Sequence, residues 1–399
     1  MDNAIPNFDE FIDRRGTYCT QWDYVADRFG QENLLPFTVS DTDFTVPHEI
    51  TQAIKKRLEH EVFGYTRWNH SAFKQSICRW YQQQFHTTIN EEWILYSPSV
   101  IYSISKLIEL NSEIGDHVVI QTPAYDAFFK TIHENQREIV ENPLIYKNYS
   151  YTIDFEDLEK KLAHPRCKVL LFCSPHNPTG RLWTENELRT IISLCKKYSV
   201  FLISDEIHMD IIRKGMTHLP VLMGGDMNGI ALCTSASKTF NTPGLVSSYL
   251  LIPDEKLRER FLLTLKNRDG LSSTSIFGMI STMTAYNECA DWVEKLNDYL
   301  DENIRLTISY LAEHLPEFTV VQPEAMYLIW IDCSQSPFTM DELQQAMITQ
   351  GQVAIMDGAT YGTAGENFLR LNVGCSKEKL LDGLARMKTS IDYLKNKQQ

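Results

Sequence analysis

The feature that most limits how this chain can fold is a series of short apolar segments, each of a length suited to a buried strand. Five such segments lie at residues 118–121, 169–173, 201–204, 230–234 and 249–252. Continuous apolar runs of this kind are typical of strands covered on both faces. Between two of them, Thr184-Glu-Asn-Glu187 has the pattern of a capping box and predicts a helix to about Tyr198. The alternation predicts an α/β fold with a mainly parallel sheet covered by helices.

The two ends of the chain depart from this alternation. The N-terminal stretch reads as irregular and polar, and helices are predicted from Pro47 to about His60, at 70–85 and after Ser99. Past residue 284 the pattern indicates a long helix to about His314. Strand-like runs at 318–321, 327–331 and 368–372 follow, with a helix near 340–350 and a frayed tail at 395–399.

A chain of 399 residues with 43% hydrophobic content can bury a large core and is long enough for two domains. We therefore expect a large domain over residues 47–283 and a smaller α+β domain over 284–399. The N-terminal segment, residues 1–46, is expected to pack with the smaller domain.

The composition excludes several classes of partner. There are 38 basic and 52 acidic residues, a net charge of −14, which opposes binding to nucleic acid or to anionic membranes. No apolar run has the length of a membrane span, and the first residues lack the pattern of a signal peptide. The nine cysteines include no C-x-x-C pair and read as reduced core residues, so we expect a cytoplasmic protein with no metal site.

The strongest indication of chemistry is Ser235-Ala-Ser-Lys238, directly after the apolar run 230–234. Small hydroxyl residues around a lysine suit a site in which a phosphate and an aldehyde lie side by side. Hydroxyls and backbone N–H groups hold the phosphate while the amine condenses with the aldehyde. Pyridoxal phosphate (PLP) requires this arrangement, although such a lysine is also common in solvated loops.

Two upstream segments favour the PLP interpretation. The run 200–204 ends in Asp205, and an acid at the end of a parallel strand faces the crevice where α/β sheets bind ligands. There it could keep a pyridinium nitrogen protonated. Asn177, in the turn Ser174-Pro-His-Asn-Pro-Thr-Gly180, could donate to the phenolic oxygen of the cofactor. Taken singly, these segments could equally be a helix cap and a Pro/Gly turn.

With these residues in place, the chain resembles fold-type I PLP enzymes of the class I/II aminotransferase superfamily over nearly its whole length. More closely, it is similar to cystathionine or cysteine-S-conjugate β-lyases of the MalY/PatB type. The Asn-Pro-Thr-Gly and Ser-x-x-Lys patterns mark the superfamily. The subgroup is indicated by Gly64-Tyr-Thr-Arg-Trp68 and Asp205-Glu-Ile-His-Met-Asp210. The resemblance implies an aspartate aminotransferase-like fold, with a seven-stranded sheet in the large PLP-binding domain.

The resemblance also implies roles for individual residues. Lys238 is implied as the Schiff-base lysine, Asp205 as the pyridinium partner and Asn177 as the contact of the ring oxygen. The remaining cofactor contacts implied are Tyr125 on the ring face, the backbone N–H groups of Val100 and Ile101 and the hydroxyls of Ser235 and Ser237 at the phosphate, and Tyr65 from the neighbouring subunit. A Tyr65 that reaches across implies a homodimer with shared active sites.

Substrate contacts follow from the same likeness. Arg370 is implied as the clamp of the substrate α-carboxylate, and Asp43 lies in a segment near which substrate enters. His208, three residues after the strand-end acid, could approach the ring or serve a structural role. Without the family, Tyr125 and Tyr65 would read equally well as core aromatics.

Three positions depart from the family patterns. Many superfamily members have a second phosphate-binding arginine eight residues after the lysine, where this chain has Val246, and the MalY/PatB type also tends to lack it. The subgroup's Ala-Asp-Met-Asp-Phe appears here as Ser40-Asp-Thr-Asp-Phe44, and its Lys-Trp-Asp as Gln21-Trp-Asp23. Because these changes lie near the expected substrate entrance, they bear on which substrate is used.

The resulting hypothesis is a PLP-dependent carbon–sulfur β-lyase. It would act on cystathionine, cysteine or related S-conjugates and release a thiol or sulfide, pyruvate and ammonia. An aminotransferase with a 2-oxo acid acceptor would use the same lysine, ring and carboxylate clamp, so residue spacing leaves both open. A PLP-fold regulator without turnover is the third alternative, although such regulators usually have a basic DNA-binding module before the fold. The preferred sulfur substrate and its physiological direction do not follow from the sequence.

Overall fold

The computed structural model describes residues 6–223 and 227–398. Its centre is a seven-stranded sheet that mixes early and late parts of the first 251 residues. In spatial order the strands are β2 (Ile94–Ser97), β10 (Ser248–Leu251), β9 (Ile230–Thr234), β8 (Phe201–Asp205), β7 (Cys167–Cys173), β3 (His117–Thr122) and β4 (Glu138–Pro143). The pairs from β9 to β4 are all parallel, and only β10 runs antiparallel to its neighbours. The predicted α/β fold with a mainly parallel sheet is confirmed.

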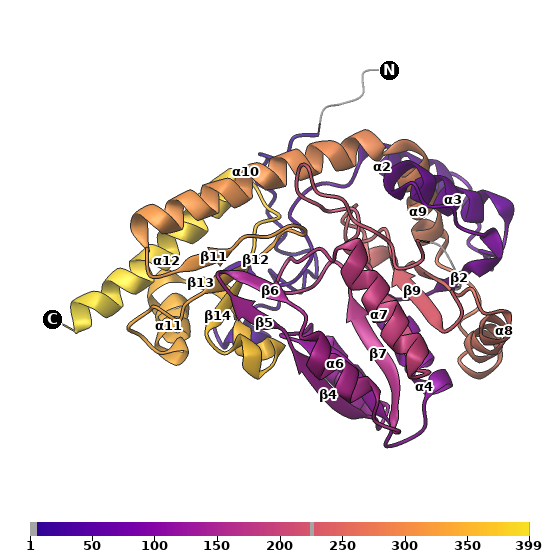
Figure 1. Cartoon of the computed structure of the whole chain (residues 1–399). Helices are drawn as coiled ribbons and strands as arrows, with labels where there is room; N and C mark the ends of the chain where they lie inside the picture. Colours follow the sequence, from indigo (N-terminus) through magenta and orange to yellow (C-terminus); the bar gives the residue numbers. More distant parts are fainter. Residues whose placement is uncertain (1–5, 224–226, 399) are drawn as a thin grey trace.

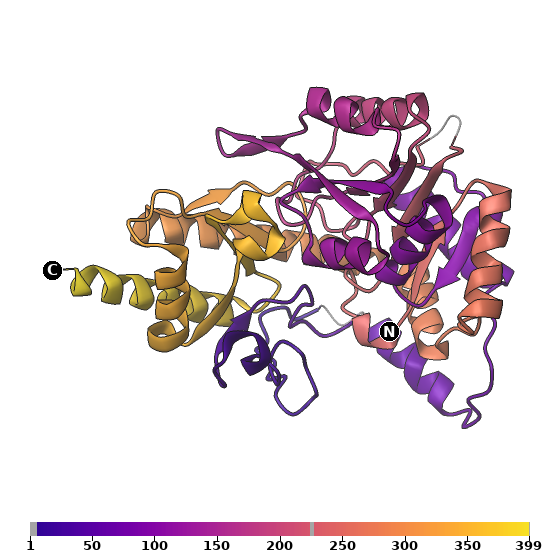
Figure 2. The same cartoon turned by 90° about the horizontal axis from the view of Figure 1, so that it is seen from below.

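Helices cover both faces of this sheet, as a parallel sheet requires. Figure 2 shows α6 (Phe155–Leu162) and α7 (Glu185–Lys197) on one face, and α4 (Val100–Asn111) and α5 (Asp126–Glu134) on the other. The predicted capping box is present at the start of α7, where the side chains of Thr184 and Glu187 each bond the other's backbone N–H. The remaining helices of this part are α2 (His48–Leu58), α3 (Ser71–Phe85), α8 (Glu255–Leu263) and α9 (Ile276–Glu288).

A second sheet lies beside the first (Figure 1) and combines one strand from the N-terminal stretch with four strands from residues 319–372. Its order is β1 (Leu35–Phe37), β13 (Val353–Asp357), β14 (Phe368–Asn372), β12 (Leu328–Asp332) and β11 (Thr319–Val321). The first strand, from the N-terminal stretch, pairs parallel with β13, and the expected packing of residues 1–46 with a smaller domain stays a prediction. The helices that accompany the second sheet are α10 (Ala290–His314), α11 (Met340–Ala346) and α12 (Lys377–Lys397). The domain bounds at 46/47 and 283/284 stay predictions.

Some sequence expectations were wrong in detail. The helix expected from 284 to 314 is two helices, because α9 ends before Cys289 and α10 starts at Ala290. Of the expected frayed tail, residues 395–397 form the last turn of α12, whose buried face includes Leu384, Met387 and Ile391, and Gln399 lies outside the described residues. The N-terminal stretch contains α1 (Ala26–Phe29) and β1. The hairpin β5 (Ile145–Lys147) and β6 (Ser150–Thr152) was not predicted.

Short helical turns complete the architecture. Single 3₁₀ turns lie at Glu91–Trp93, Pro243–Leu245, Gly358–Tyr361 and Thr363–Gly365, and π turns at Thr264–Arg268 and Met347–Gly351. Within residues 6–223 and 227–398, no helix has the length and apolarity needed to cross a membrane. The same ranges contain no group of three or more His, Cys, Asp or Glu side chains placed to hold a metal ion.

Candidate active site

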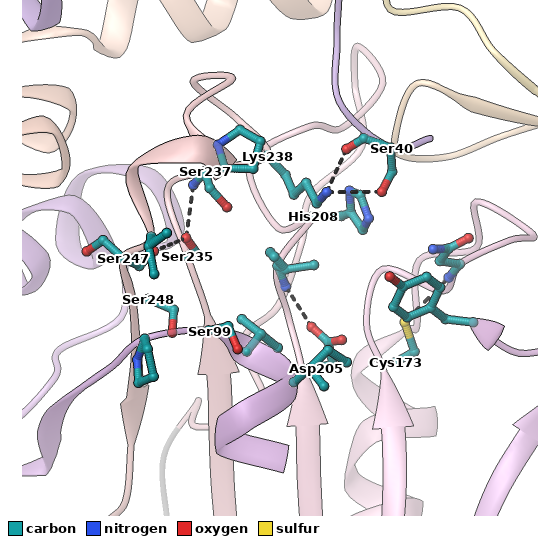
Figure 3. Close-up of a pocket in the computed structure, with 18 residues that line it drawn as sticks. Ser40, Ser99, Cys173, Asp205, His208, Ser235, Ser237, Lys238, Ser247 and Ser248 are labelled. Carbon is teal, nitrogen blue, oxygen red and sulfur yellow. Dashed lines mark hydrogen bonds between the residues drawn. The ribbon is translucent and has the colours of Figure 1, made fainter. Parts of the chain in front are cut away.

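Four neighbouring parallel strands each deliver one predicted site residue to the same edge of the large sheet. Asp205 is the last residue of β8, and Tyr125, Asn177 and Lys238 lie three or four residues after β3, β7 and β9. The carboxyl ends of parallel strands share one edge, which is where open α/β sheets bind ligands. A cavity of about 250 Å³ lies at this edge (Figure 3). It is lined by Ser40, Pro98, Ser99, Val100, Ile101, Tyr125, Cys173, Asn177, Asp205, Ile207, His208, Ser235, Ser237, Lys238, Pro243, Val246, Ser247 and Ser248.

Lys238 extends from the turn after β9 into this cavity. Its Nζ donates to the carbonyl oxygen of Ser40 at 2.7 Å and to the Ser40 Oγ at 3.0 Å. Burial lowers the pKa of the amine to about 8, and the nearby carboxylates of Asp41 and Asp205 oppose that shift. An amine with a pKa close to neutrality can act as a nucleophile and as a proton acceptor.

Asp205 lies at the floor of the cavity with 5% of its surface exposed. Its Oδ1 accepts one hydrogen bond, from the backbone N–H of Ile207 at 3.2 Å. Burial raises the pKa of this carboxyl to about 7, and the charge of Lys238 opposes the shift only weakly. A buried carboxylate with so little compensation favours a cationic partner, such as a protonated ring nitrogen.

The start of α4 forms another part of the cavity wall and has the features that favour an anion. Ser99 caps the helix, its Oγ accepting from the N–H of Tyr102 at 3.1 Å, and Val100 and Ile101 form the first turn. The free N–H groups and dipole at such an end attract a phosphate. Ser235 and Ser237 face it from the turn after β9, with the Ser235 Oγ accepting from the Ser237 N–H at 3.1 Å.

Arg370 is buried in β14 and reaches the cavity edge through Asn177. It donates from Nη1 to the Asn177 Oδ1 at 3.3 Å and from Nη2 to the Thr38 carbonyl at 2.7 Å, with its carbon Cζ 4.8 Å from the centre of the Tyr361 ring. Within residues 6–223 and 227–398, its Nε has no hydrogen-bond partner. None of the described carboxylates is paired with this guanidinium, so it retains capacity for an anion.

Tyr125 and His208 both line the cavity. Tyr125 is half-buried before α5, and burial raises the pKa of its phenol. His208 is buried, and its Nδ1 has no partner in the part of the chain that the structure describes. Burial together with the charges of Lys238 and Arg370 lowers its imidazole pKa to about 3. The ring is therefore neutral. Its edge-on packing against Tyr327 gives it a structural neighbour as well as a place in the cavity wall.

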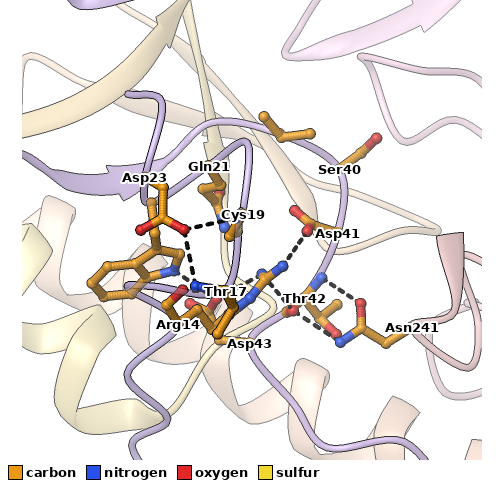
Figure 4. A network of polar contacts seen from close by, with 12 residues as sticks. Arg14, Thr17, Cys19, Gln21, Asp23, Ser40, Asp41, Thr42, Asp43 and Asn241 are labelled. Atoms are coloured by element: carbon orange, nitrogen blue, oxygen red, sulfur yellow. Dashed lines mark hydrogen bonds and ion pairs between the residues drawn. The ribbon is translucent and has the colours of Figure 1, made fainter. Parts of the chain in front are cut away.

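Two predicted site residues lie away from the cavity. Tyr65 is fully exposed between α2 and α3, at 101% of its reference surface. Asp43 lies in a buried network (Figure 4), where its carboxylate accepts from Trp22 Nε1 at 3.0 Å, Arg14 Nη1 at 3.1 Å and Lys379 Nζ at 2.5 Å. Its oxygens are therefore already bonded to this protein's own cations and indole.

Sequence reasoning missed Ser40 as the partner of Lys238, along with Cys173, Ser247 and Ser248 in the cavity wall. The two members of the Ser40–Lys238 contact are 198 residues apart, and no local pattern connects them. The one available signal was the departure of Ser40-Asp-Thr-Asp-Phe44 from the subgroup segment.

Known proteins resemble this chain along almost its whole length. The protein MalY of Escherichia coli K12 is 44% identical, with 96% of this chain and 98% of MalY aligned. The cystathionine β-lyase PatB of Bacillus subtilis 168 is 39% identical, with 96% of this chain and 100% of PatB aligned. A PLP-bound crystal structure from Clostridium difficile 630, provisionally named an aminotransferase, superposes with a TM-score of 0.94 at 35% identity, covering 97% of this chain and 100% of that one.

The family assignment rests on the match of residues 32–387 to one family and agrees with these likenesses. That range includes each of the strand-end residues at the cavity as well as Arg370. The chain belongs to the family of class I and II aminotransferases.

Proposed function

We propose that this protein is a PLP-dependent carbon–sulfur β-lyase. Its substrates are cystathionine, cysteine or related S-conjugates, which it converts to a thiol or sulfide, pyruvate and ammonia. The observation that carries the proposal is the convergence of Lys238, Asp205 and a helix N-terminus on one cavity. Support for the lyase reaction comes from the 39% identity to the cystathionine β-lyase PatB over nearly the whole chain.

The residues at the cavity fit PLP in charge and in position. Asp205 would hold the ring nitrogen, and the carboxylate has little compensation from the protein itself. Val100, Ile101 and the hydroxyls of Ser235 and Ser237 would hold the phosphate, and the Tyr125 ring would cover the cofactor ring. Val246 stands where many family members have an arginine, so the phosphate would be held by the helix dipole and by neutral donors. When bound, PLP supplies an electron sink for the charge formed at the substrate Cα.

The chain's own residues then orient the substrate and move its proton. Arg370 would bind the α-carboxylate with the donor capacity that the structure leaves free at its guanidinium. Lys238, with a pKa of about 8, would take the Cα proton, a step worth about 10²- to 10⁴-fold in rate for a well-placed base. Asn177 would donate from its amide nitrogen while its Oδ1 accepts from Arg370.

A homodimer with shared active sites is the assembly we propose. Tyr65 is fully exposed, and Val62 and Phe63 beside it are 65% and 55% exposed, an apolar run that a second subunit would cover. In this assembly Tyr65 would reach the phosphate of the neighbouring site. The unpaired state of all nine cysteines agrees with the expected reducing, cytoplasmic location.

The test is an assay of pyruvate and sulfide from cystathionine and from cysteine, with and without a 2-oxo acid. Release of pyruvate without acceptor supports the lyase. Turnover only with acceptor would overturn it in favour of an aminotransferase, the second candidate, which the likeness to the provisionally named aminotransferase favours. Lys238→Ala should abolish both the absorbance of lysine-bound PLP and pyruvate release, and binding without turnover in the wild type would favour a regulator.

A further inference from the structure

The segment 38–42, directly after β1, is fixed by side chains along its whole length. Each of its five carbonyl oxygens accepts a side-chain hydrogen bond. The donors are Arg370 to Thr38, Asn372 to both Val39 and Asp41, Lys238 and Tyr327 to Ser40, and Arg14 and Asn241 to Thr42. These donors come from the N-terminal stretch, from the turn after β9 and from the second sheet. The position of this backbone is therefore determined independently of Lys238.

Ser40 is the member of this segment that faces the cavity. Its side chain is 7% exposed, and its Oγ lies 3.0 Å from the Lys238 Nζ (Figure 3). Its carbonyl accepts from the same amine at 2.7 Å and from the Tyr327 hydroxyl at 2.9 Å. The amine thus has two acceptors on one residue, and only the hydroxyl depends on the residue type.

We propose that the hydroxyl of Ser40 positions the amine of Lys238 whenever that amine is not bonded to the cofactor. The proposal rests on the proposed function, because a lysine that is released and then takes a proton needs a defined orientation. The carbonyl and the hydroxyl of Ser40 would each accept one N–H of the amine. The remaining position on the nitrogen would then point toward the substrate.

The hydroxyl also acts on the basicity of the amine. A hydrogen bond from an ammonium group is stronger than one from a neutral amine, so Ser40 favours the protonated form. The other groups that act on the amine are Asp41 and Asp205, which favour the charge, and Arg370, which opposes it. His208 lies beside them as a neutral ring. Removal of the Ser40 hydroxyl should therefore lower the pKa of the amine.

The chain supplies a matched control at Thr42, on the same segment. Its side chain is buried, and its Oγ1 has no hydrogen-bond partner among the residues that the structure describes. Thr42→Val removes a hydroxyl of the same kind, two residues away, with the shape retained. Ser40→Ala removes the proposed contact, and Ser40→Cys replaces it with a weak acceptor of similar size.

The experiment measures the amine directly in the full-length chain after removal of the cofactor. Trinitrobenzenesulfonate reacts with the neutral amine, so the rate of modification at position 238, followed by peptide mapping against pH, gives its pKa. Ser40→Ala should shift the midpoint down by about one pH unit, the scale of one hydrogen bond. Thr42→Val should match the wild type, and Ser40→Cys should fall between. An unchanged midpoint in Ser40→Ala, or an equal shift in Thr42→Val, overturns the proposal.

A second readout uses the cofactor-loaded protein with L-alanine, which has no leaving group. Deuterium uptake at its Cα in heavy water reports the proton transfer without elimination, and Ser40→Ala should slow it about tenfold at unchanged KM, as loss of one positioning bond of about 1.4 kcal/mol does. Uptake at the wild-type rate would contradict the role of the hydroxyl. If wild-type Lys238 does not bind PLP, the proposed function fails, while the amine titration still decides the Ser40 contact. Where Ser40→Ala does not fold, Ser40→Cys decides both readouts.

Discussion

The guanidinium of Arg370, in β14, and the amide of Asn177, in the turn after β7, meet at 3.3 Å, although they are 193 residues apart. The contact joins the residue proposed to bind the substrate carboxylate to one proposed to contact the cofactor. Because both side chains are buried, a change in one alters the position of the other.

Arg370→Lys should weaken substrate binding far more than it alters the fold. A lysine keeps the charge but loses the planar pair of donors, and each charge-assisted hydrogen bond is worth about 1.5–3 kcal/mol, so KM should rise about 10- to 100-fold. Steady-state kinetics with cysteine measure this. Arg189→Lys, at an exposed arginine of α7, is the control and should leave KM unchanged. An unchanged KM in Arg370→Lys would exclude the carboxylate role.

Asp205→Asn should stabilise the protein when the cofactor is absent. The carboxyl has a pKa of about 7 in the folded chain against 3.8 as the reference, so the unfolded state loses its proton first as pH rises. The free energy of unfolding of the wild type therefore falls between about pH 4 and pH 7, and the loss levels off at up to about 4 kcal/mol. Urea unfolding at pH 5 and pH 8 should show a larger gain for Asp205→Asn at pH 8. Equal gains at both values would contradict the raised pKa.

With the cofactor bound, Asp205→Asn should be less stable than the wild type instead of more stable. The carboxylate would then face a cationic ring nitrogen, and Asp205→Asn should lose that pairing together with most of the activity. Thermal unfolding of both proteins with saturating PLP checks this, since a ligand stabilises the state that binds it. A variant that gains as much stability from PLP as the wild type would exclude the pairing.

Asp43→Asn should lower the stability of the protein and leave substrate binding unchanged. The Asp43 carboxylate is buried and bonded to Arg14 and Lys379, and removing one partner of a buried pair costs about 3–5 kcal/mol. The urea concentration at the midpoint of unfolding should fall accordingly. The KM for cysteine, measured on the protein that remains folded, should stay near the wild-type value. A raised KM without lost stability would restore the substrate-contact role expected from the sequence.

Tyr65 permits a test of the proposed shared sites by subunit mixing. Tyr65→Ala and Lys238→Ala should each be impaired as pure proteins. When equal amounts are unfolded and refolded together, half of the dimers are mixed and each holds one intact site, so activity should recover to about one quarter of wild type. No recovery from a mixture that forms dimers would exclude a tyrosine supplied across the interface.

The sequence predicted best what depends on local pattern. Segments 230–234 and 368–372 match β9 and β14, and the capping box before α7 is present, because burial on both faces and helix capping leave local signatures. The break at Cys289 was missed because apolar and polar residues continue with helical spacing on both sides of it. The contacts of Ser40 with Lys238 and of Asp43 with Lys379 join residues 198 and 336 positions apart, and such pairings are decided by packing of the whole chain.

The pairing of β1 with β13 has a consequence for the biogenesis of the protein. Leu35 is hydrogen-bonded to a residue about 317 positions later, so the ribosome must release nearly the entire polypeptide before the first strand finds its neighbour. Until then the position of Ser40 is not fixed, and the cavity at the edge of the large sheet lacks this part of its wall. Any cofactor bound before that point would therefore occupy a cavity that still lacks the Ser40 contact to Lys238.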